Sequence, residues 1–426
     1  MRRRSPPLYS GSSKPDRPAV LYLTNNLPCP PTSGGQLREY QLLRRLSARF
    51  TVHLIAFVSN KAQPAATEAS LAFLASITEV VTNPSTAPAG MPLRMRLHYA
   101  PRGADIVRSI FQRYRFLLVH VQGYFLMHYL ERIPQTPVVL ATENIEFALE
   151  EQAETLGYRD FNAAATRVVE IDAWRRANVC VCVTPEDAEV VRQYVATVPV
   201  RCVAGGVDHV LDVPRHKPDC SQAGTCLYVA NFSWAPSRDA AVHLLRDIWP
   251  AISRLVPESR LVLAGYGIDS SLSAEAAQTK GVTLYGEYGT FAEVASTAAL
   301  FVFPMRFGGG IKVKIIEAIG AGLPIVTTTA ALRGLPQEIR QHIWLADSPQ
   351  AFAEMAAQAL AQVEDRTTRA NSARLLLTSL MPTWADLACD LAAIWQCALK
   401  EGQDNEEVHT VSRAAASGST DTTRRH

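Results

Sequence analysis

The sequence lacks the short motifs that define several large enzyme classes. It contains no HExxH, no GxSxG and no P-loop ending in GKS or GKT, which excludes zinc proteases, simple serine hydrolases and P-loop kinases. The one GxG that follows an expected strand, Gly265-Tyr266-Gly267, is not followed by a third fingerprint glycine. Binding of NAD is therefore unsupported.

Cysteine pairs, charge of one sign and long hydrophobic runs are also missing. The eight cysteines form no CxxC pair, so neither a zinc finger nor a redox motif is indicated, and a reducing, cytoplasmic compartment is the simplest expectation. A net charge of +2 gives no reason to expect a nucleic-acid partner. No segment approaches the roughly 20 apolar residues that cross a bilayer. Any membrane contact would then be peripheral, at the inner face.

The length of 426 residues predicts two domains of similar size. Residues 1–18 and 401–426 are polar and without apolar periodicity, so we expect disordered tails there. Residues 212–224 are rich in proline, basic and other polar residues, with almost no apolar content, and are expected to form the linker. This leaves a first domain at 19–211, a second at 225–380, and a helix at 381–400 that returns to the first domain.

Short apolar runs alternate with longer helical patterns in both domains, which is typical of βαβ units and a parallel sheet. We therefore predict an α/β protein with two tandem Rossmann-like, doubly wound domains and a cleft between them. Six strands are expected in the first domain, at 20–24, 51–58, 117–121, 137–141, 179–183 and 200–203. Six more are expected in the second, at 226–230, 260–264, 281–285, 300–303, 324–327 and 342–346. Ligands of such sheets bind outside the carboxyl ends of the strands.

The most informative segment follows the strand at 300–303, where three glycines, Gly308 to Gly310, lead into a helix. Backbone N–H groups at such a turn can bind an anion. Lys312 and Lys314 oppose the helix dipole, so a diphosphate partner would explain them. Lys314 and Glu317 share a helix face, where the carboxylate can accept hydrogen bonds from ribose hydroxyls. The alternative is a solvated lysine pair and an intrahelical ion pair.

Two loops of the first domain offer further polar or flexible positions. Gly34 and Gly35 precede a helix and allow close approach of a ligand, although a plain strand-to-helix turn explains them equally well. Glu143 and Asn144 follow the strand at 137–141, where a ligand contact and a helix cap are both open. In the second domain, Gly265 and Gly286 could shape a base or ribose pocket.

Together these segments resemble the GT-B-fold glycosyltransferases, in particular glycosyltransferase family 4. The resemblance covers residues 19–400 and rests on four separate motifs. They are the Pro-Pro-Thr-Ser-Gly-Gly loop with Arg38 on the following helix, Glu143-Asn144-Ile145-Glu146, Gly206-Val207-Asp208, and the block from Arg306 to Pro324 with Thr327.

The resemblance implies a retaining transfer of a sugar from a nucleoside-diphosphate sugar to a carbohydrate, lipid-linked or small-molecule acceptor, most commonly in polysaccharide or glycoconjugate synthesis. It implies no cofactor, and the absent Asp-x-Asp agrees with a reaction without metal. Lys314, Arg306 and Glu317 would be the catalytic residues. The donor-binding residues would be Gly308, Gly309, Gly310, Ile311, Lys312, Asn231, Gly265 and Gly286. The acceptor or phosphate loop would comprise Gly34, Gly35, Arg38, Glu143 and Asn144.

The sequence departs from the family pattern at Gly309, where the first of two paired glutamates would fall, and at Glu143, where many relatives have histidine. Two other functions therefore stay open. One is a nucleotide-sugar 2-epimerase on the same fold, which needs no acceptor. The other is a non-catalytic paralogue that binds the donor.

Overall fold

The computed structural model describes residues 17–60, 69–211 and 224–417. The expected tails at 1–16 and 418–426 and the expected linker at 212–223 lie outside these residues. Arg17 and Pro18, which were expected in the tail, belong to the first domain. The Arg17 guanidinium donates to Ser47 O at 2.7 Å, and Pro18 O accepts from Thr51 N at 2.9 Å. The ladder between the first two strands therefore begins before residue 19.

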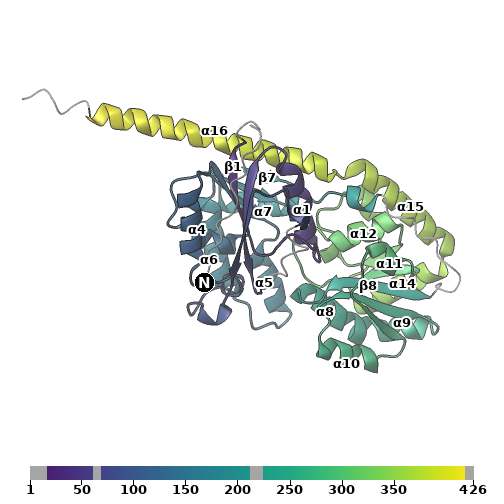
Figure 1. Ribbon diagram of the computed structural model, residues 1–426. Coiled ribbons are helices and arrows are strands. Elements are labelled where there is room, and N and C mark those ends of the chain that lie inside the picture. Colours follow the sequence, from purple (N-terminus) through teal and green to yellow (C-terminus); the bar gives the residue numbers. More distant parts are fainter. Residues whose placement is uncertain (1–16, 61–68, 212–223, 418–426) are drawn as a thin grey trace, which may run out of the picture.

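The described chain forms two parallel sheets with helices on their faces, as expected (Figure 1). The first sheet has the order β3-β2-β1-β4-β5-β6-β7 and the second β10-β9-β8-β11-β12-β13. The strands of the first are β1 (Ala19–Thr24), β2 (Thr51–Val58), β3 (Ser76–Val81), β4 (Leu118–Gln122), β5 (Val138–Thr142), β6 (Val179–Cys182) and β7 (Val200–Cys202). Those of the second are β8 (Thr225–Asn231), β9 (Arg260–Tyr266), β10 (Val282–Gly286), β11 (Leu300–Phe303), β12 (Ile325–Thr327) and β13 (Trp344–Leu345).

The helices cover both faces of each sheet. Those of the first domain are α1 (Gly34–Leu46), α3 (Leu93–Leu97), α4 (Gly103–Arg113), α5 (Glu146–Thr155), α6 (Ala163–Arg176) and α7 (Pro185–Tyr194), with the short η1 (Pro84–Thr86), η2 (Tyr124–Leu130) and η3 (Asp208–Val210). Those of the second are α8 (Ala235–His243), η5 (Leu244–Ile248), α9 (Trp249–Leu255), α10 (Ser270–Gln278), α11 (Phe291–Ala295), α12 (Val313–Ala321), η6 (Thr329–Ala331), α13 (Gln337–Arg340), α14 (Pro349–Ala361) and α15 (Val363–Leu380).

All twelve expected strands are present to within about two residues at each end, while β3 was missed. Its sequence, Ser-Ile-Thr-Glu-Val-Val, lies at the sheet edge and is mostly only half-buried. An edge strand of this kind carries neither a continuous apolar run nor a strict alternation, so the pattern does not reveal it.

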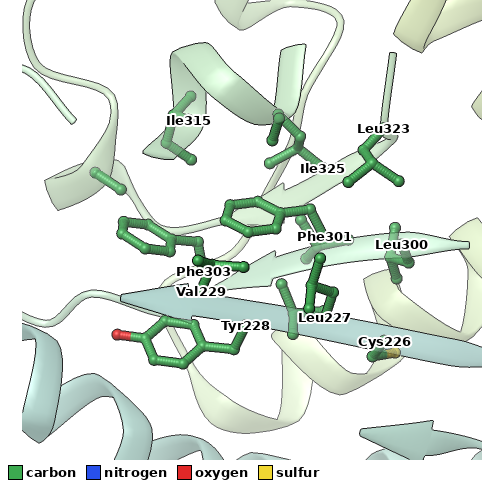
Figure 2. Packing of buried hydrophobic residues seen from close by; sticks show 14 of the residues in the cluster. Cys226, Leu227, Tyr228, Val229, Leu300, Phe301, Phe303, Ile315, Leu323 and Ile325 are labelled. Atoms are coloured by element: carbon green, nitrogen blue, oxygen red, sulfur yellow. The ribbon is translucent and has the colours of Figure 1, made fainter. Parts of the chain in front are cut away.

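Each sheet is held by apolar side chains of its strands and the helices above them. Figure 2 shows the core of the second domain, where Tyr228 and Val229 of β8 meet Phe301 and Phe303 of β11, with Ile315 of α12 above them. The ring centroids of Phe301 and Phe303 are 5.5 Å apart in a stacked arrangement. The packing fixes β11 and α12 relative to each other. The loop that joins them, which carries the three glycines, is therefore anchored at both ends.

The last helix, α16 (Trp384–Ser417), returns to the first domain as expected and packs on α1, β4 and β5 (Figure 1, yellow). Trp384, Leu391 and Trp395 are buried in that domain's core. The helix does not end at residue 400, so the expectation of a disordered tail from residue 401 is wrong as far as Ser417. The segment contains no proline, and a helix that is already nucleated and docked gains one hydrogen bond for each residue that it adds.

Candidate functional site

The N-termini of two helices from different domains meet at the interface. An added Cβ on Gly34, the first residue of α1, would lie 2.7 Å from Val313 Cγ2 on the first residue of α12. Neither helix has an acidic residue in its first turn, and α12 has no side-chain cap. Free N–H groups and positive dipole ends from both domains therefore face the same space, which favours an anion there.

The glycine loop before α12 lies against the carboxyl end of β5. A Cβ on Gly309 would come within 2.8 Å of the Asn144 amide group, and one on Gly310 within 2.4 Å of Glu143 O. The Asn144 amide is best satisfied with its nitrogen donating to Gly309 O at 3.1 Å and to Glu143 O at 3.2 Å. The glycines thus do more than expose N–H groups. They allow the edge of the first domain to approach the loop of the second.

Lys314 and Glu317 share a face of α12 as expected and form an ion pair, with Nζ to Oε2 at 2.7 Å, which is the alternative that the sequence left open. The Lys314 ammonium also lies 5.5 Å from the ring centre of Tyr288 and 5.9 Å from that of Phe291. Burial lowers the pKa of Lys314, but the Glu317 carboxylate and the Tyr288 hydroxyl outweigh it and raise that pKa. A fixed cation and an adjacent carboxylate are therefore held on the first turns of α12, beside the converging helix ends.

Lys312 has partners other than those that the sequence suggested. It is only 6% exposed, and its ammonium donates to Gly309 O at 2.6 Å and Gly310 O at 3.3 Å. Burial lowers its pKa to about 8, partly offset by Asp187. The Lys312 ammonium therefore holds two carbonyl groups of the glycine loop, while the Gly308 N–H donates to Gln152 Oε1 at 3.4 Å.

Arg306 forms a bidentate ion pair with Asp239 of α8, with Nε to Oδ2 at 2.9 Å. Tyr158, which follows α5 in the first domain, donates from its hydroxyl to Asp239 Oδ1 at 2.7 Å. Asp239 is 3% exposed, so this junction between the domains is buried. The Arg306 side chain is thus bound to a carboxylate, and it borders a groove lined by residues of α8, α10 and the turn after α5.

The remaining expected donor residues have mixed roles. Asn231 lies at the end of β8, and its side chain accepts a hydrogen bond from Ser233 N at 3.0 Å. Ile311 packs against Gly205 and Gly334 at the domain interface. A Cβ on Gly265 would lie 1.8 Å from Ala230 O, so this glycine is required by the pairing of β9 with β8. Gly286, with φ of 78°, has open space around it. Gly286 therefore has room beside it, whereas Gly265 does not.

On the first domain, Gly35 and Glu143 are brought together. A Cβ on Gly35 would lie 2.9 Å from Glu143 Oε2, while Glu143 Oε1 accepts from Gln122 Nε2 at 2.8 Å. Burial raises the pKa of Glu143, opposed chiefly by Arg38. Arg38 itself is buried and donates to Val203 O at 2.8 Å. The Arg38 guanidinium therefore binds the segment after β7, and its positive charge lowers the pKa of Glu143.

Several residues of the site escaped sequence analysis: Glu39, Gln122, Tyr158, Asp239 and Tyr288. Glu39 is 3% exposed on the face of α1 that buries Leu42 and Leu43, and burial raises its pKa to about 8. A glutamate at i−3 and i−4 from two buried leucines was the signal that could have found it. Gln122 directly follows the strand expected at 117–121, and this position was its signal. The other three carry no local signal, because their partners are distant in sequence.

A pocket lies at the carboxyl ends of β1, β4 and β5, beside Glu143 and Asn144. Its lining includes Asn25, Gln122, Thr142 and Glu146, and its volume is about 20 Å³, room for about one water molecule. This is the point where the order of the first sheet reverses, between β1 and β4. Doubly wound sheets bind their ligands at this position. Within the described ranges no cluster of His, Cys, Asp or Glu could hold a metal ion, and no helix could span a membrane.

Two doubly wound domains whose carboxyl edges meet at a glycine loop define the GT-B class of glycosyltransferases. Residues 223–362 match the family model described as Glycosyl transferases group 1. The second domain is thus of the group 1 type, and the expected class, a glycosyltransferase of the GT-B fold, is confirmed. No curated protein matches the chain.

Solved structures show the same fold. Sucrose-phosphate synthase from Thermosynechococcus elongatus is 17% identical with a TM-score of 0.71, over 90% of this chain and 100% of that one. Anabaena HepE, in complex with UDP and glucose, is 14% identical with a TM-score of 0.65, over 88% and 99%. WaaG, a glycosyltransferase involved in lipopolysaccharide biosynthesis, is 16% identical with a TM-score of 0.64, over 88% and 99%.

Proposed function

We propose that the chain is a family 4 type enzyme that transfers a sugar, with retention and without metal, from a nucleoside-diphosphate sugar to a hydroxyl acceptor. The observation that carries the proposal is the convergence of the α1 and α12 N-termini at Gly34 and Val313, beside the Lys314–Glu317 pair. A diphosphate leaving group accepts hydrogen bonds from free N–H groups and pairs with Lys314. Electrostatic stabilisation of this kind is commonly the largest catalytic contribution.

Glu317 would accept hydrogen bonds from the donor ribose, and its pairing with Lys314 keeps both side chains in place. In the structure of HepE with UDP-glucose, a relative of the same fold binds a donor of this chemical class. The involvement of WaaG in lipopolysaccharide biosynthesis supports a role in polysaccharide or glycoconjugate synthesis. Because Lys314 and the helix ends supply positive charge at the leaving group, we expect transfer to continue in EDTA.

The first experiment is a thermal-shift screen of the chain with UDP, GDP, ADP and their sugar conjugates, since a bound ligand raises the melting temperature by mass action. For the best nucleotide, Lys314→Met should weaken binding by at least about tenfold, which corresponds to about 1.4 kcal/mol. Glu317→Gln should weaken binding of the nucleoside diphosphate by several-fold. The exposed Glu354→Gln on α14 is the matched control.

Transfer is measured as nucleoside diphosphate released in the presence of acceptor glycosides, and the product's anomeric configuration is read by NMR. Lys314→Met should abolish transfer while the circular dichroism spectrum is unchanged. Wild-type activity in both Lys314→Met and Glu317→Gln would contradict the proposed site. An epimerised sugar nucleotide formed from the donor alone would contradict transfer and favour the epimerase.

A further inference from the structure

A groove of about 380 Å³ lies at the junction between the two domains. One wall is the turn after α5, residues 156–158 of the first domain, and the opposite wall is formed by α8 and α10 of the second (Figure 1). Its volume falls within the range of ligand sites, about 300–1,000 Å³. Gly34, Val313 and Lys314 do not line it, so a ligand here would touch both domains outside the converging helix ends.

The charged side chains of the groove are matched with one another. Three arginines line it, and each forms an ion pair with a carboxylate beside it. The pairs are Arg238–Asp269, Arg246–Glu275 and Arg306–Asp239. Because three cations face three carboxylates, the groove carries no excess charge that would attract an ionic ligand.

The ion pairs leave hydrogen-bonding groups free. All three arginines bind their carboxylates through Nε and Nη2, and none of the three Nη1 groups has a hydrogen bond among the described residues. Each Nη1 carries N–H donors, and the carboxylate oxygens keep further lone pairs. The pairing fixes the planar groups, so these donors and acceptors are positioned before a ligand arrives. They suit a ligand whose own groups both donate and accept, as hydroxyl groups do.

The rest of the lining is largely apolar and includes one aromatic ring. Leu156, Ala235 and Val242 contribute aliphatic surface, and Tyr158 contributes its ring, while its hydroxyl donates to Asp239 Oδ1 at 2.7 Å. Ligand sites commonly combine such apolar surface with a few fixed polar groups. A sugar unit has hydroxyl groups at its edge and C–H groups on its faces, so it is complementary to both parts of the groove.

The groove adjoins the loop on which the reaction is placed. Arg306 lines the groove and precedes Gly309 by three residues, a span of at most about 11 Å of chain. Gly309 in turn lies against Asn144 at the edge of the first domain. A chain of linked sugars whose last unit reacts at this loop can therefore extend into the groove.

We propose that the groove binds an uncharged segment of a glycan, so that the acceptor is an oligosaccharide or polysaccharide chain and not a single sugar. The inference rests on the proposed function, because it takes the glycan as the acceptor of the transfer reaction. Val242 and Arg246 determine this specificity, the first through apolar contact with the glycan and the second through its free Nη1. Neither belongs to the donor site.

The test measures binding by calorimetry, with and without the best nucleoside diphosphate, so that it does not depend on turnover. The probes are maltotriose, cellotriose and triacetylchitotriose, each compared with its monosaccharide, and trigalacturonate as the charged trisaccharide. We expect at least one neutral trisaccharide to bind at least about tenfold more tightly than its monosaccharide and than trigalacturonate. Val242→Phe, which fills the groove, should weaken that binding by at least about tenfold, and Arg246→Met by about three- to tenfold.

Each variant has a matched control. Val168→Phe makes the same exchange at a position of α6 that is 71% exposed, and Arg192→Met breaks an exposed ion pair with Glu189 on α7. Both controls should bind the trisaccharide as the wild type does. All four variants should keep the melting temperature and the nucleotide affinity of the wild type.

The inference is overturned if no trisaccharide binds more tightly than its monosaccharide, if trigalacturonate binds as tightly as the neutral chains, or if both groove variants bind as the wild type does. A Val242→Phe variant that loses affinity for the sugar nucleotide but not for the nucleoside diphosphate would assign the groove to the donor sugar and would also overturn it. A failure of all nucleotides to bind, with trisaccharide binding intact, would contradict the donor site and leave the glycan groove standing.

Discussion

The ammonium of Lys312 lies 2.6 Å from the carbonyl oxygen of Gly309, inside the interface between the two domains. Lys312 is buried, and its pKa is lowered to about 8 by that burial. The positive charge of Lys312 near the glycine loop is therefore lost as the pH rises through about 8, a pH at which enzymes are commonly assayed. Affinity for a diphosphate should depend on pH through this group.

We expect the affinity of the wild type for its nucleoside diphosphate to fall between pH 7.5 and pH 9, because Lys312 loses its proton in this window. Lys312→Met should bind more weakly at pH 7.5, by about tenfold, and show little further loss up to pH 9. Calorimetric titration at the two pH values measures both effects. An equal fall with pH in wild type and variant would assign the dependence to another group.

Glu39 gives a second pH-dependent prediction, this time for stability. Its pKa is about 8 in the folded chain against an ordinary value of 4.5, chiefly because burial disfavours the carboxylate. Between these two values the folded state retains a proton that the unfolded state has lost, so stability falls as pH rises. Glu39→Gln, which is neutral throughout, should be stabilised relative to wild type at pH 8 by on the order of 3–5 kcal/mol.

The measurement is urea unfolding of wild type and Glu39→Gln at pH 5 and pH 8. At pH 5 the difference should fall to about 1 kcal/mol, because this pH lies only half a unit above the ordinary pKa of 4.5, so retaining the proton in the folded state costs little. Glu189→Gln, at an exposed position of α7, is the control and should show no such trend. A difference between wild type and Glu39→Gln that is the same at both pH values would refute the interpretation.

Gly309→Ala should separate the domains without unfolding them. The added Cβ would lie 2.8 Å from Asn144 Oδ1 and 2.9 Å from its Cβ, closer than real Cβ atoms come, so the glycine loop and Asn144 must move apart. We expect a larger radius of gyration in small-angle scattering and a loss of transfer of at least about tenfold, because a displacement of about 1 Å can cost a hundredfold in rate.

Gly205→Ala is a matched control at the same interface. Its added Cβ would lie 3.4 Å from the nearest atom, Ile311 Cγ2, which is an ordinary van der Waals distance. It should keep both the radius of gyration and the activity of wild type. If Gly309→Ala behaves in the same way, the close approach of Asn144 is not required for closure.

Trp395→Ala should destabilise the first domain. Trp395 on α16 is fully buried, stacks edge-on against Phe50 at 5.0 Å and donates from Nε1 to His120 at 3.1 Å. Removal of a buried tryptophan leaves a cavity and costs about 3–5 kcal/mol. Differential scanning calorimetry should show a lower melting temperature, while Leu375→Ala, which is 71% exposed on α15, should melt as wild type does.

The fold was largely predictable because buried parallel strands are continuous apolar runs, as at 226–230. Each run can be recognised from its own residues, without knowledge of the rest of the chain. The glycine turn and the shared helix face of Lys314 and Glu317 were predictable for a similar reason, since both are local in sequence. The strand β3 and the continuation of α16 beyond residue 400 were not, because neither segment has an apolar periodicity in its sequence.

The partners of individual side chains could not be predicted, because they depend on how the domains meet. Arg306 was expected at a phosphate, and in the structure it pairs with Asp239, which also accepts from Tyr158 of the other domain. Gly309 was interpreted as exposed backbone for an anion, and the structure shows in addition a contact with Asn144. Contacts across an interface follow from tertiary geometry, which no spacing in the sequence encodes.

The position of α16 has a consequence for synthesis of the chain. Trp384, Leu391 and Trp395 complete the core of the first domain, yet the ribosome makes them after the whole second domain. The first domain therefore cannot reach its final state when its own residues emerge, although N-terminal domains generally fold first. Part of the apolar surface of the first domain stays exposed to solvent until α16 is made, near the end of translation. During that interval we expect a chaperone to bind this surface.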